Sequence, residues 1–484
     1  MTSIDSHKQR EFAIEIVRTL RARGHEALWA GGCVRDELLG LKPKDYDVAT
    51  TARPEEIRNI FGHRRTVAVG AAFGVICVIG PRHAGQIDVA TFREDAGYSD
   101  GRHPDSVSFS TPEADARRRD FTINGLFYDP IDDQVIDYVG GKDDLARGIV
   151  RAIGRPRDRL AEDKLRLLRA VRFASAFDFQ LEPETSEAVT AMANQVTQVS
   201  VERIADEIRK ILAHRQRMRG AIMLRETGLL ATVLPELAPG PDGAPVTGNG
   251  RNADEAWVET LEVLTLLVEP SFPLALASLV REYVDAAGAQ LICRRWKLSN
   301  AETQRVSWLV AEQNSLLRAR EARWSRLQRL LVTEGIEDLV GLHAAIAEAS
   351  GKSLDDIDYC RQLLRQPRDV LDPPPLISGD DLIALGIPRG PDYHRLLEAV
   401  RDAQLDKEIE TKDEGLKLVN RLRGQSDEGP TSTSGPFRII RRRGTVTRET
   451  RTWTWPYCSD YLPAGPTYWP RSRQSAGRSL PGPW

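Results

Sequence analysis

Two aspartates separated by one residue are the first side chains in this chain that could do chemistry. Asp45 and Asp47 flank Tyr46 in the stretch DYDVAT, which reads as a strand. Alternate residues of a strand point to the same side, so we expect both carboxylates to face one spot. Close carboxylates repel each other unless a cation joins them, and a pair of Mg²⁺ ions roughly 3.5–4 Å apart is usual in phosphoryl transfer. The pattern predicts a magnesium site, although Asp-x-Asp alone is often only an exposed loop.

A glycine pair precedes these aspartates. Residues 27–30 read as a short apolar strand, Gly31 and Gly32 turn the chain, and residues 33–39 carry apolar side chains at helical spacing. A Gly-Gly turn lets the backbone approach a phosphate, and free N–H groups at a helix N-terminus attract its charge. Arg35 lies in the first turn of the predicted helix, where its guanidinium could bind a phosphate through two hydrogen bonds. Gly-Gly is also a common turn, which is the alternative interpretation.

Taken in this order, the strand, the Gly-Gly turn, the Arg-bearing helix and the Asp-x-Asp strand resemble the nucleotidyltransferase superfamily of DNA polymerase β. The segments GGCVRDELLG and DYDVAT are similar to the first motif of the class II tRNA nucleotidyltransferases (CCA-adding enzymes) and the related bacterial poly(A) polymerases. In this superfamily a third carboxylate of the metal site would lie where the chain has Asp88, in the segment QIDVATF. An acid on an edge strand is the alternative for Asp88.

Two further segments resemble motifs of the same family. In ARRRDFTINGLF, Arg119 matches the arginine that binds the nucleotide, and Asp120 and Asn124 are expected at i and i+4 on one helix face. Residues 158–179 predict one amphipathic helix that matches the motif EDxxRxxRAxRF. The match implies that four residues of this helix belong to the nucleotide pocket: Asp163, Arg166, Arg169 and Arg172. The first three would share one face of the helix, and a salt-bridged exposed face is the alternative.

The composition limits the classes of partner. The chain has 484 residues, of which 67 are Lys or Arg and 70 are Asp or Glu, so its net charge is −3. Any RNA contact must therefore come from local basic patches. The five cysteines include no CxxC pair, which favours a reducing compartment and argues against a zinc site or a disulfide framework. The sequence contains no apolar signal core and no membrane-spanning run, so we expect a cytoplasmic protein without a membrane partner.

Local patterns predict strands and helices in the first part of the chain and helices alone after it, which is an α+β fold. The resemblance implies that the first part is a small polymerase-β-like head with a mixed sheet and helices, followed by an all-α neck, body and tail. We expect the head at residues 1–153, the neck at 154–235, and the body and tail at 236–424, where the resemblance implies tRNA binding. Residues 93–116 lack periodicity and predict a mobile loop. In the neck, 199–214 predicts a helix with Ser200 as N-cap and Arg203 near tRNA. Residues 425–484 predict a disordered extension, with RNA binding by its Arg and Trp residues as the alternative.

The resemblance implies template-independent addition of C and/or A to the 3′ end of tRNA, with NMP transferred from CTP or ATP and pyrophosphate released. Two Mg²⁺ ions held by Asp45 and Asp47 are the expected cofactors, and no stable protein partner is implied.

Asp163 only accepts and Arg166 only donates hydrogen bonds, so this pair should select the amino group and unprotonated ring nitrogen of cytosine and adenine. A poly(A) polymerase acting on other RNA 3′ ends and a non-catalytic RNA-binding protein are the alternatives. The choice between full CCA, CC-only and A-only addition stays open.

Overall fold

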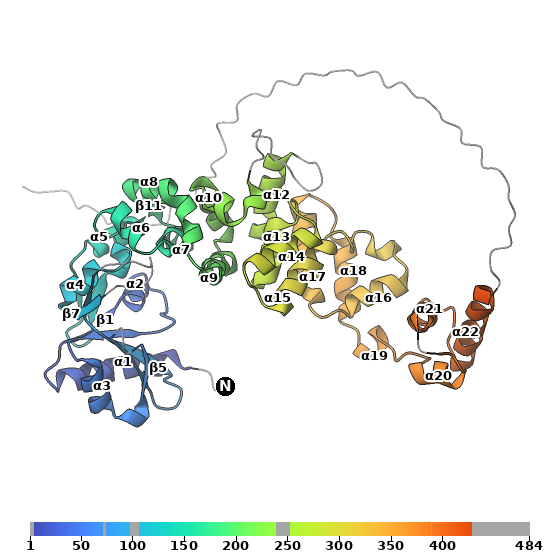
Figure 1. Ribbon diagram of the computed structural model, residues 1–484, viewed down its shortest axis with the longest axis horizontal. Coiled ribbons are helices and arrows are strands. Elements are labelled where there is room, and N and C mark those ends of the chain that lie inside the picture. Colours follow the sequence, from blue (N-terminus) through green and yellow to red (C-terminus); the bar gives the residue numbers. More distant parts are fainter. Residues whose placement is uncertain (1–3, 71–73, 97–105, 239–251, 389, 428–484) are drawn as a thin grey trace, which may run out of the picture. The chain divides into compact units, whose positions relative to one another are not determined.

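A seven-stranded mixed sheet forms the centre of the head (Figure 1). The computed structural model describes residues 4–70, 74–96, 106–238, 252–388 and 390–427. The strand order is β3-β4-β5-β2-β1-β8-β9, and within this sheet only β2 and β5 pair in parallel. The strands are β1 (Ala27–Ala30), β2 (Asp47–Thr50), β3 (Thr66–Gly70), β4 (Val75–Ile79), β5 (Gln86–Thr91), β8 (Leu126–Asp129) and β9 (Gln134–Asp137). The predicted mixed sheet is confirmed.

Short helices connect and cover these strands. The first helix of the head starts after Asp5, whose side chain accepts the backbone N–H of His7, and it buries Phe12, Ile16 and Leu20. These apolar side chains recur at helical spacing and join the core that the sheet forms. The helical segments of the head are α1 (Ser6–Arg21), α2 (Gly32–Leu38), α3 (Pro54–Phe61), η1 (His63–Arg65), α4 (Pro112–Arg117), η3 (Thr122–Asn124) and α5 (Gly141–Arg147).

The structure corrects the loop predicted at residues 93–116. β6 (Arg93–Ala96) and β7 (Ser106–Phe109) pair in antiparallel fashion, and α4 follows directly. Thr111 caps α4 by accepting the backbone N–H of Ala114. Each strand has only four residues, too few for a periodic pattern to show in the sequence. Only residues 97–105 of the predicted loop lie outside the described part.

The neck contains the second correction, because residues 158–179 do not form one helix. The chain leaves the helical conformation at Asp163, with φ −142° and ψ 108°, between α6 and α7. Its carboxylate Oδ1 accepts the backbone N–H of Leu165 at 3.0 Å, and such a local hydrogen bond competes with a continuous helix. The segments here are α6 (Pro156–Glu162), α7 (Leu165–Phe177), α8 (Pro183–Met192), η4 (Ala193–Gln198), α9 (Val201–Ala213), α10 (Arg217–Glu226), α11 (Leu229–Val233), η5 (Pro235–Leu237) and the two-stranded pair β10 (Ile149–Val150) and β11 (Gln180–Leu181).

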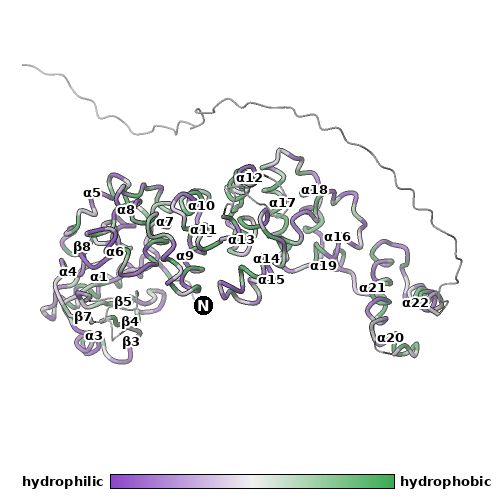
Figure 2. The backbone as a smooth tube through the Cα atoms, turned by 45° about the horizontal axis from the view of Figure 1, so that its top comes forward, coloured by the Kyte–Doolittle hydropathy of each residue, from purple (hydrophilic) through white to green (hydrophobic). Residues whose placement is uncertain are grey.

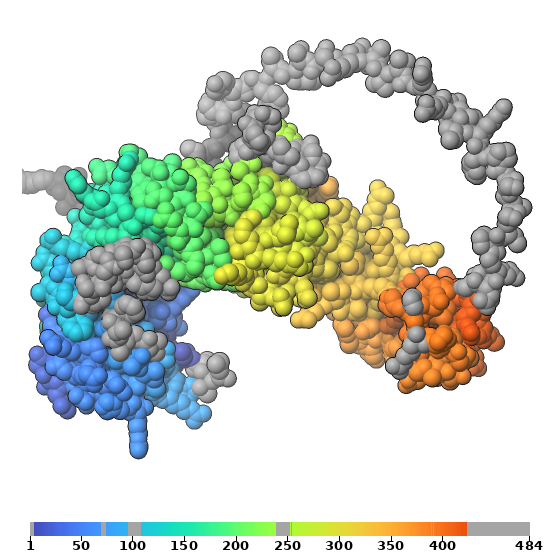
Figure 3. Space-filling model, in the orientation of Figure 1, coloured from blue at the N-terminus to red at the C-terminus, as the bar shows by residue number. Residues whose placement is uncertain are grey.

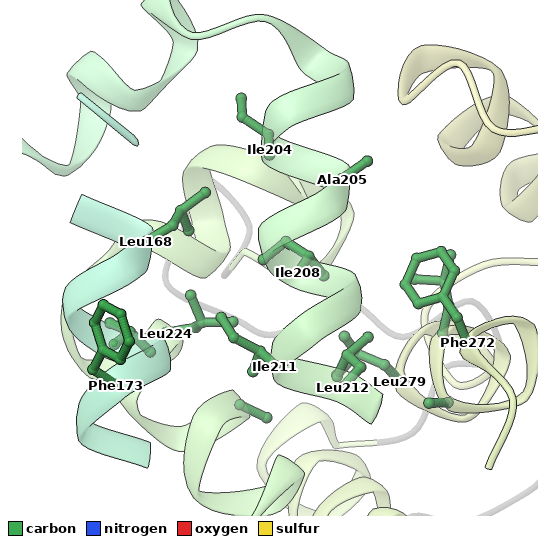
Figure 4. Packing of buried hydrophobic residues seen from close by; sticks show 14 of the residues in the cluster. Leu168, Phe173, Ile204, Ala205, Ile208, Ile211, Leu212, Leu224, Phe272 and Leu279 are labelled. Atoms are coloured by element: carbon green, nitrogen blue, oxygen red, sulfur yellow. The ribbon is translucent and has the colours of Figure 1, made fainter. Parts of the chain in front are cut away.

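Helix α9 packs on two sides (Figure 4). Ile204 and Ile208 point toward Leu168 of α7, while Leu212 lies beside Leu279 of the body. Ser200 is at the N-cap position of this helix, as predicted, but its side chain forms no capping hydrogen bond. Side chains of one hydrophobic cluster extend from the head through the neck into the body. In the space-filling view the atoms of the neck and of the body form a continuous surface where the ribbon shows gaps between the helices (Figure 3).

Helices make up the remaining described residues, as expected. Hydrophobic and hydrophilic residues alternate along most of them (Figure 2), whereas α13, with the sequence FPLALASLV, is apolar nearly all round and buried. Ile377, Leu382, Leu396 and neighbouring residues form a separate core in the last three helices. The segments are α12 (Ala253–Leu266), α13 (Phe272–Val280), α14 (Ala286–Arg295), α15 (Asn300–Ala311), η6 (Ala319–Glu321), α16 (Trp324–Leu331), α17 (Ile336–Ala349), α18 (Asp355–Leu364), α19 (Arg368–Leu371), α20 (Gly379–Ala384), α21 (Pro391–Leu405) and α22 (Lys412–Asp427).

The predicted C-terminal extension lies outside the described residues, except that α22 continues past residue 424 to Asp427. Among the helices that the structure describes, none is long and apolar enough to cross a bilayer. The cysteines of the described part, Cys33, Cys77, Cys293 and Cys360, are free and buried.

Replacement of Gly141 by alanine should destabilise the head. A Cβ on Gly141 would lie 2.1 Å from the backbone oxygen of Thr122, so α5 would have to move away from η3. We expect Gly141→Ala to lower the free energy of unfolding by at least about 1–3 kcal/mol, measured as a lower midpoint of thermal unfolding. Gly341→Ala is the matched control, since its Cβ would meet only Leu274 at 3.8 Å. Equal midpoints for the two variants would contradict this packing.

Candidate active site

A cavity of about 630 Å³ lies between residues of the head and residues of the neck. Its lining contains every residue that the sequence predicts for the site except Asp88, together with Arg118, Leu165, Phe173 and Arg203. The predicted residues in the lining are Gly31, Gly32, Arg35, Asp45, Asp47, Arg119, Asp120, Asn124, Asp163, Arg166, Arg169 and Arg172. Segments far apart in the sequence therefore meet here, as a site built on several elements requires.

Gly31 turns the chain at the end of β1 and makes room for an arginine. Its φ of +74° is a conformation that side chains other than glycine rarely adopt. A Cβ at this position would also lie 2.6 Å from Nη1 of Arg119. The turn thus brings the backbone of the Gly-Gly pair directly beneath a guanidinium, at the start of the seven-residue helix α2.

The carboxylates come together through the sheet. Asp47 is the first residue of β2, whereas Asp45 precedes the strand, so the prediction that both belong to it is wrong for Asp45. Asp88 is the register partner of Asp47 in the parallel pair β2–β5. Because β5 lies between β4 and β2, the alternative that Asp88 is an edge-strand acid is wrong. Desolvation and the carboxylates of Asp45 and Asp88 raise the pKa of Asp47 to about 6, while Arg119 opposes this shift.

The carboxylate oxygens of Asp45 and Asp47 are the kind of ligand that a hard divalent cation prefers. Asp45 and Asp47 offer carboxylate oxygens, and neither side chain forms an ion pair with a described residue. The repulsion that raises the pKa of Asp47 is the kind that a bound cation relieves. Within the described ranges, no three His, Cys, Asp or Glu side chains are already arranged as a complete set of metal ligands. Metal binding therefore stays a prediction that fits the residues present.

Asp120 is the centre of a buried hydrogen-bond network. Its Oδ2 accepts Nε and Nη2 of Arg169 at 2.8 and 2.6 Å, and its Oδ1 accepts Nδ2 of Asn124 at 3.0 Å. Asn124 in turn accepts Nη1 of Arg35 at 2.5 Å. Burial raises the pKa of Asp120, but the guanidinium of Arg169 outweighs it and holds this pKa well below its usual range. The predicted helix is wrong, because Asp120 precedes the short 3-10 helix η3, yet Asp120 and Asn124 do meet.

Arg35 contacts protein groups in this arrangement. Its Nε and Nη2 donate to Oδ1 of Asp36 at 2.9 and 2.7 Å. Its guanidinium carbon also lies 4.5 Å from the ring centre of Phe177. Phosphate binding by Arg35, predicted from the sequence, would have to compete with these contacts and remains a prediction.

Asp115 holds two arginines and was not predicted. Arg118 donates to its Oδ1 at 2.7 Å and Arg119 to its Oδ2 at 2.9 Å. Burial raises the pKa of Asp115, but the two guanidinium groups lower it by more. Asp115 precedes these arginines by three and four residues, which is the spacing of side-chain pairs on a helix, although α4 ends at Arg117 and the arginines follow it.

Oppositely charged neighbours hold the side chains that were predicted to read the base. Arg203 of α9 donates to Oδ2 of Asp163 at 2.8 Å, and Glu162 accepts Nη1 of Arg166 at 2.5 Å. Glu207, also on α9, accepts Nε of Arg172 at 2.6 Å. Because Asp163 lies outside α7, the shared helix face predicted for it is wrong, although Asp163 and Arg166 line the same cavity. The sequence placed Arg203 only near tRNA, and no local pattern could have identified its contact with Asp163 or that of Glu207 with Arg172, because the partners are 40 and 35 residues away.

A second hollow of about 770 Å³ adjoins this cavity, and the two share five lining residues: Gly32, Arg35, Asp45, Arg172 and Phe173. Lys42, Lys44, Arg209 and Lys210 give it a mainly positive lining. Desolvation, Arg215 and Lys44 lower the pKa of His214, which also lines it. A polyanion entering here would reach Asp45.

Three segments of the chain match known protein families. Residues 27–151 match the "Poly A polymerase head domain", and residues 178–240 match the "Probable RNA and SrmB-binding site of polymerase A". Residues 275–419 match domain 2 of the tRNA nucleotidyltransferases. The first match contains both aspartates and the Gly-Gly turn, and the second contains Arg203.

Individual proteins extend this similarity over most of the chain. The CCA-adding enzyme of Lactobacillus johnsonii is 31% identical over 412 residues, which cover 84% of this chain and 95% of the relative. Poly(A) polymerase I of Haemophilus influenzae is 39% identical, covering 47% of this chain and 52% of the relative. A similar solved structure is the crystal structure of Bacillus stearothermophilus CCA-adding enzyme in complex with CTP, which is 28% identical in sequence. The structural alignment covers 87% of this chain and 99% of the solved chain, with a TM-score of 0.69. The chain is therefore a nucleotidyltransferase that belongs to the family of class II CCA-adding enzymes and bacterial poly(A) polymerases, with a polymerase-β-like head.

Proposed function

We propose that this protein adds C and/or A nucleotides to the 3′ end of tRNA without a nucleic-acid template, releasing pyrophosphate from CTP or ATP. The observation that carries the proposal is a single cavity that contains the Asp45–Asp47 pair, several arginines and the Asp163–Arg166 pair. One nucleotide bound in this cavity could therefore contact three kinds of group: carboxylates that can bind metal, arginines that can bind the triphosphate, and side chains that can read the base. Sequence similarity to CCA-adding enzymes over most of the chain supports the same reaction.

The triphosphate binds between the Gly31–Gly32 backbone and the arginines of the cavity. Arg119 lies over the Gly-Gly turn, and Asp115 and the ring of Phe127 fix its guanidinium. Arg169 and Arg172 contribute further positive charge from α7. Positioning and charge stabilisation of this kind carry phosphoryl transfer without a covalent intermediate.

Asp45 and Asp47 would hold the Mg²⁺ ions, and Asp88, the register partner of Asp47 on the neighbouring strand, would support them. When bound, two Mg²⁺ ions supply activation of the primer 3′-hydroxyl and neutralisation of the leaving pyrophosphate. The protein contributes carboxylates whose mutual repulsion favours cation binding, and the β2–β5 register places Asp47 beside Asp88.

Asp163 and Arg166 select the base. Asp163 accepts a hydrogen bond from the exocyclic amino group of cytosine or adenine, and Arg166 donates one to the adjacent ring nitrogen. Uracil and guanine present a carbonyl oxygen and a ring N–H in these places, so each would leave two buried groups unpaired. The protein thus replaces a template strand.

The 3′ end of the RNA enters through the second hollow, whose lysines and arginines lie next to Asp45. Phosphates of the primer are neutralised there, which makes binding dependent on salt. The neck and domain 2 segments, which match RNA-binding and tRNA nucleotidyltransferase families, contribute the rest of the tRNA surface.

A poly(A) polymerase is the second candidate, because one similar protein carries that name. The deciding experiment is primer extension on tRNA that ends before CCA, and on an unstructured RNA, with each nucleoside triphosphate alone and with CTP and ATP together. Addition that stops after CCA on tRNA supports the proposal. Long A tracts on the unstructured RNA would favour the second candidate, and the single-nucleotide reactions separate CC-only from A-only addition.

Asp47→Asn should remove nucleotide addition and leave RNA binding in place. The substitution keeps the size of the side chain but removes a charged ligand, which costs several kcal/mol of transition-state stabilisation, or at least about a hundredfold in kcat. Asp45→Asn should behave similarly. Primer extension with Mg²⁺ and tRNA binding by fluorescence anisotropy measure the two effects. Asp132→Asn, at an exposed position of the head, is the control and should retain wild-type turnover; wild-type turnover by Asp47→Asn would refute the metal assignment.

Asp163→Asn should relax the choice between CTP and UTP. The new Nδ2 donates to the O4 carbonyl of uracil, while Oδ1 can still accept the amino group of cytosine. One of the two mismatches with uracil is thereby repaired, which corresponds to about 1–3 kcal/mol. We expect the ratio of kcat/KM for CTP over UTP to fall at least about tenfold. Asp158→Asn on α6 is the matched control and should keep the wild-type ratio; an unchanged ratio in Asp163→Asn would mean that the base binds elsewhere.

A further inference from the structure

We propose that Arg203, on α9, sets base selectivity as a positioning residue that fixes the carboxylate of Asp163. This inference rests on the proposed function, because it concerns the same base-reading site. Neither the sequence motifs nor the similarity of the neck to RNA-binding families assigns this role to Arg203, and the sequence suggested only proximity to tRNA.

The contact joins two side chains that are both largely shielded from water. Nη2 of Arg203 lies 2.8 Å from Oδ2 of Asp163, and the two side chains are only 24% and 16% exposed. Both residues line the cavity. A charge-assisted hydrogen bond in such surroundings is stronger and more directional than one at an open surface.

Asp163 depends on such support because of its position in the backbone. It lies in an extended conformation between α6 and α7, outside either helix. The backbone N–H of Leu165 holds Oδ1 at 3.0 Å, and Arg203 holds Oδ2. One hydrogen bond to each oxygen fixes the plane of the carboxylate and leaves each oxygen a free lone pair for the amino group of a base.

Arg203 can act as a fixed support because the helix that carries it is firmly packed. Its neighbour Ile204 is buried, and Figure 4 shows Ile204 and Ile208 of α9 turned toward Leu168 of α7. The same α7 carries Arg166, the second member of the base-reading pair. Packing between α7 and α9 therefore couples the position of Arg203 to that of Arg166.

Loss of Arg203 should affect the wrong base more than the right one. Without its second hydrogen bond, the carboxylate can rotate about the Cβ–Cγ bond, a torsion with weak intrinsic preference. Rotation lets the carboxylate avoid the O4 carbonyl of uracil, so the penalty against UTP falls. Cytosine can still hold the carboxylate through its amino group, so CTP loses less.

The experiment measures kcat/KM for CTP and for UTP on the full-length protein, with tRNA that ends before CCA, in Arg203→Ala and Arg203→Lys. We expect Arg203→Ala to lower the ratio of CTP over UTP at least about tenfold, and Arg203→Lys to restore part of it, because lysine can still donate to Oδ2. Arg225→Ala removes an arginine–aspartate pair between α10 and α12 outside the cavity, so it should keep the wild-type ratio.

Three outcomes separate the possibilities. A parallel fall of kcat/KM for both nucleotides in Arg203→Ala would overturn the inference, because it would indicate a phosphate-binding or purely structural role. An unchanged ratio in Arg203→Ala together with a lowered ratio in Asp163→Asn would also overturn the inference while leaving the proposed function intact. Unchanged ratios in both variants would overturn the base-reading site itself.

Discussion

The buried carboxylate of Asp120 is the constraint on which the site depends. A charge removed from water must be paired and hydrogen-bonded, or it destabilises the fold by several kcal/mol. Asp120 meets this requirement through hydrogen bonds from Arg169 of the neck and Asn124 of the head. Asn124 in turn accepts a hydrogen bond from Arg35 of α2. The segment between α4 and β8, helix α2 and helix α7 are therefore held in one arrangement. These three elements line the cavity together with Asp45, Asp47, Asp163 and Arg203.

The sheet supplies a second constraint, which acts on the carboxylates. β2 and β5 form the one parallel pair in the seven-stranded sheet, and their register places Asp47 beside Asp88. Backbone hydrogen bonds thus hold negative charges close together, and desolvation, together with repulsion from Asp45 and Asp88, raises the pKa of Asp47. The close carboxylates destabilise the folded protein, and a cation bound between them would remove this repulsion.

The sequence predicted those parts of the site that local patterns encode. The strand before Gly31, the turn at Gly31 and the helix after it are visible as an apolar run, a glycine pair and a 3.6-residue period, and the structure has all three. The break at Asp163 could not be predicted, because apolar spacing continues through it and only the hydrogen bond to Leu165 reveals it. The contacts of Arg203 with Asp163 and of Glu207 with Arg172 were missed for another reason: the partners are distant in sequence, so tertiary packing alone brings them together.

Four pairs of opposite charge share one design, in which an ionic partner fixes a side chain that lines the cavity. Asp115 holds Arg119, Glu162 holds Arg166, Glu207 holds Arg172, and Arg203 holds Asp163. Each pair reduces the rotational freedom of a long or freely turning side chain before any ligand arrives. An enzyme that copies a template can rely on base pairing for its accuracy, whereas a pocket of side chains can discriminate only as sharply as those side chains are fixed. The pairs that surround this cavity therefore follow from selecting bases with protein groups, since a mobile donor or acceptor would turn to satisfy the wrong base as readily as the right one.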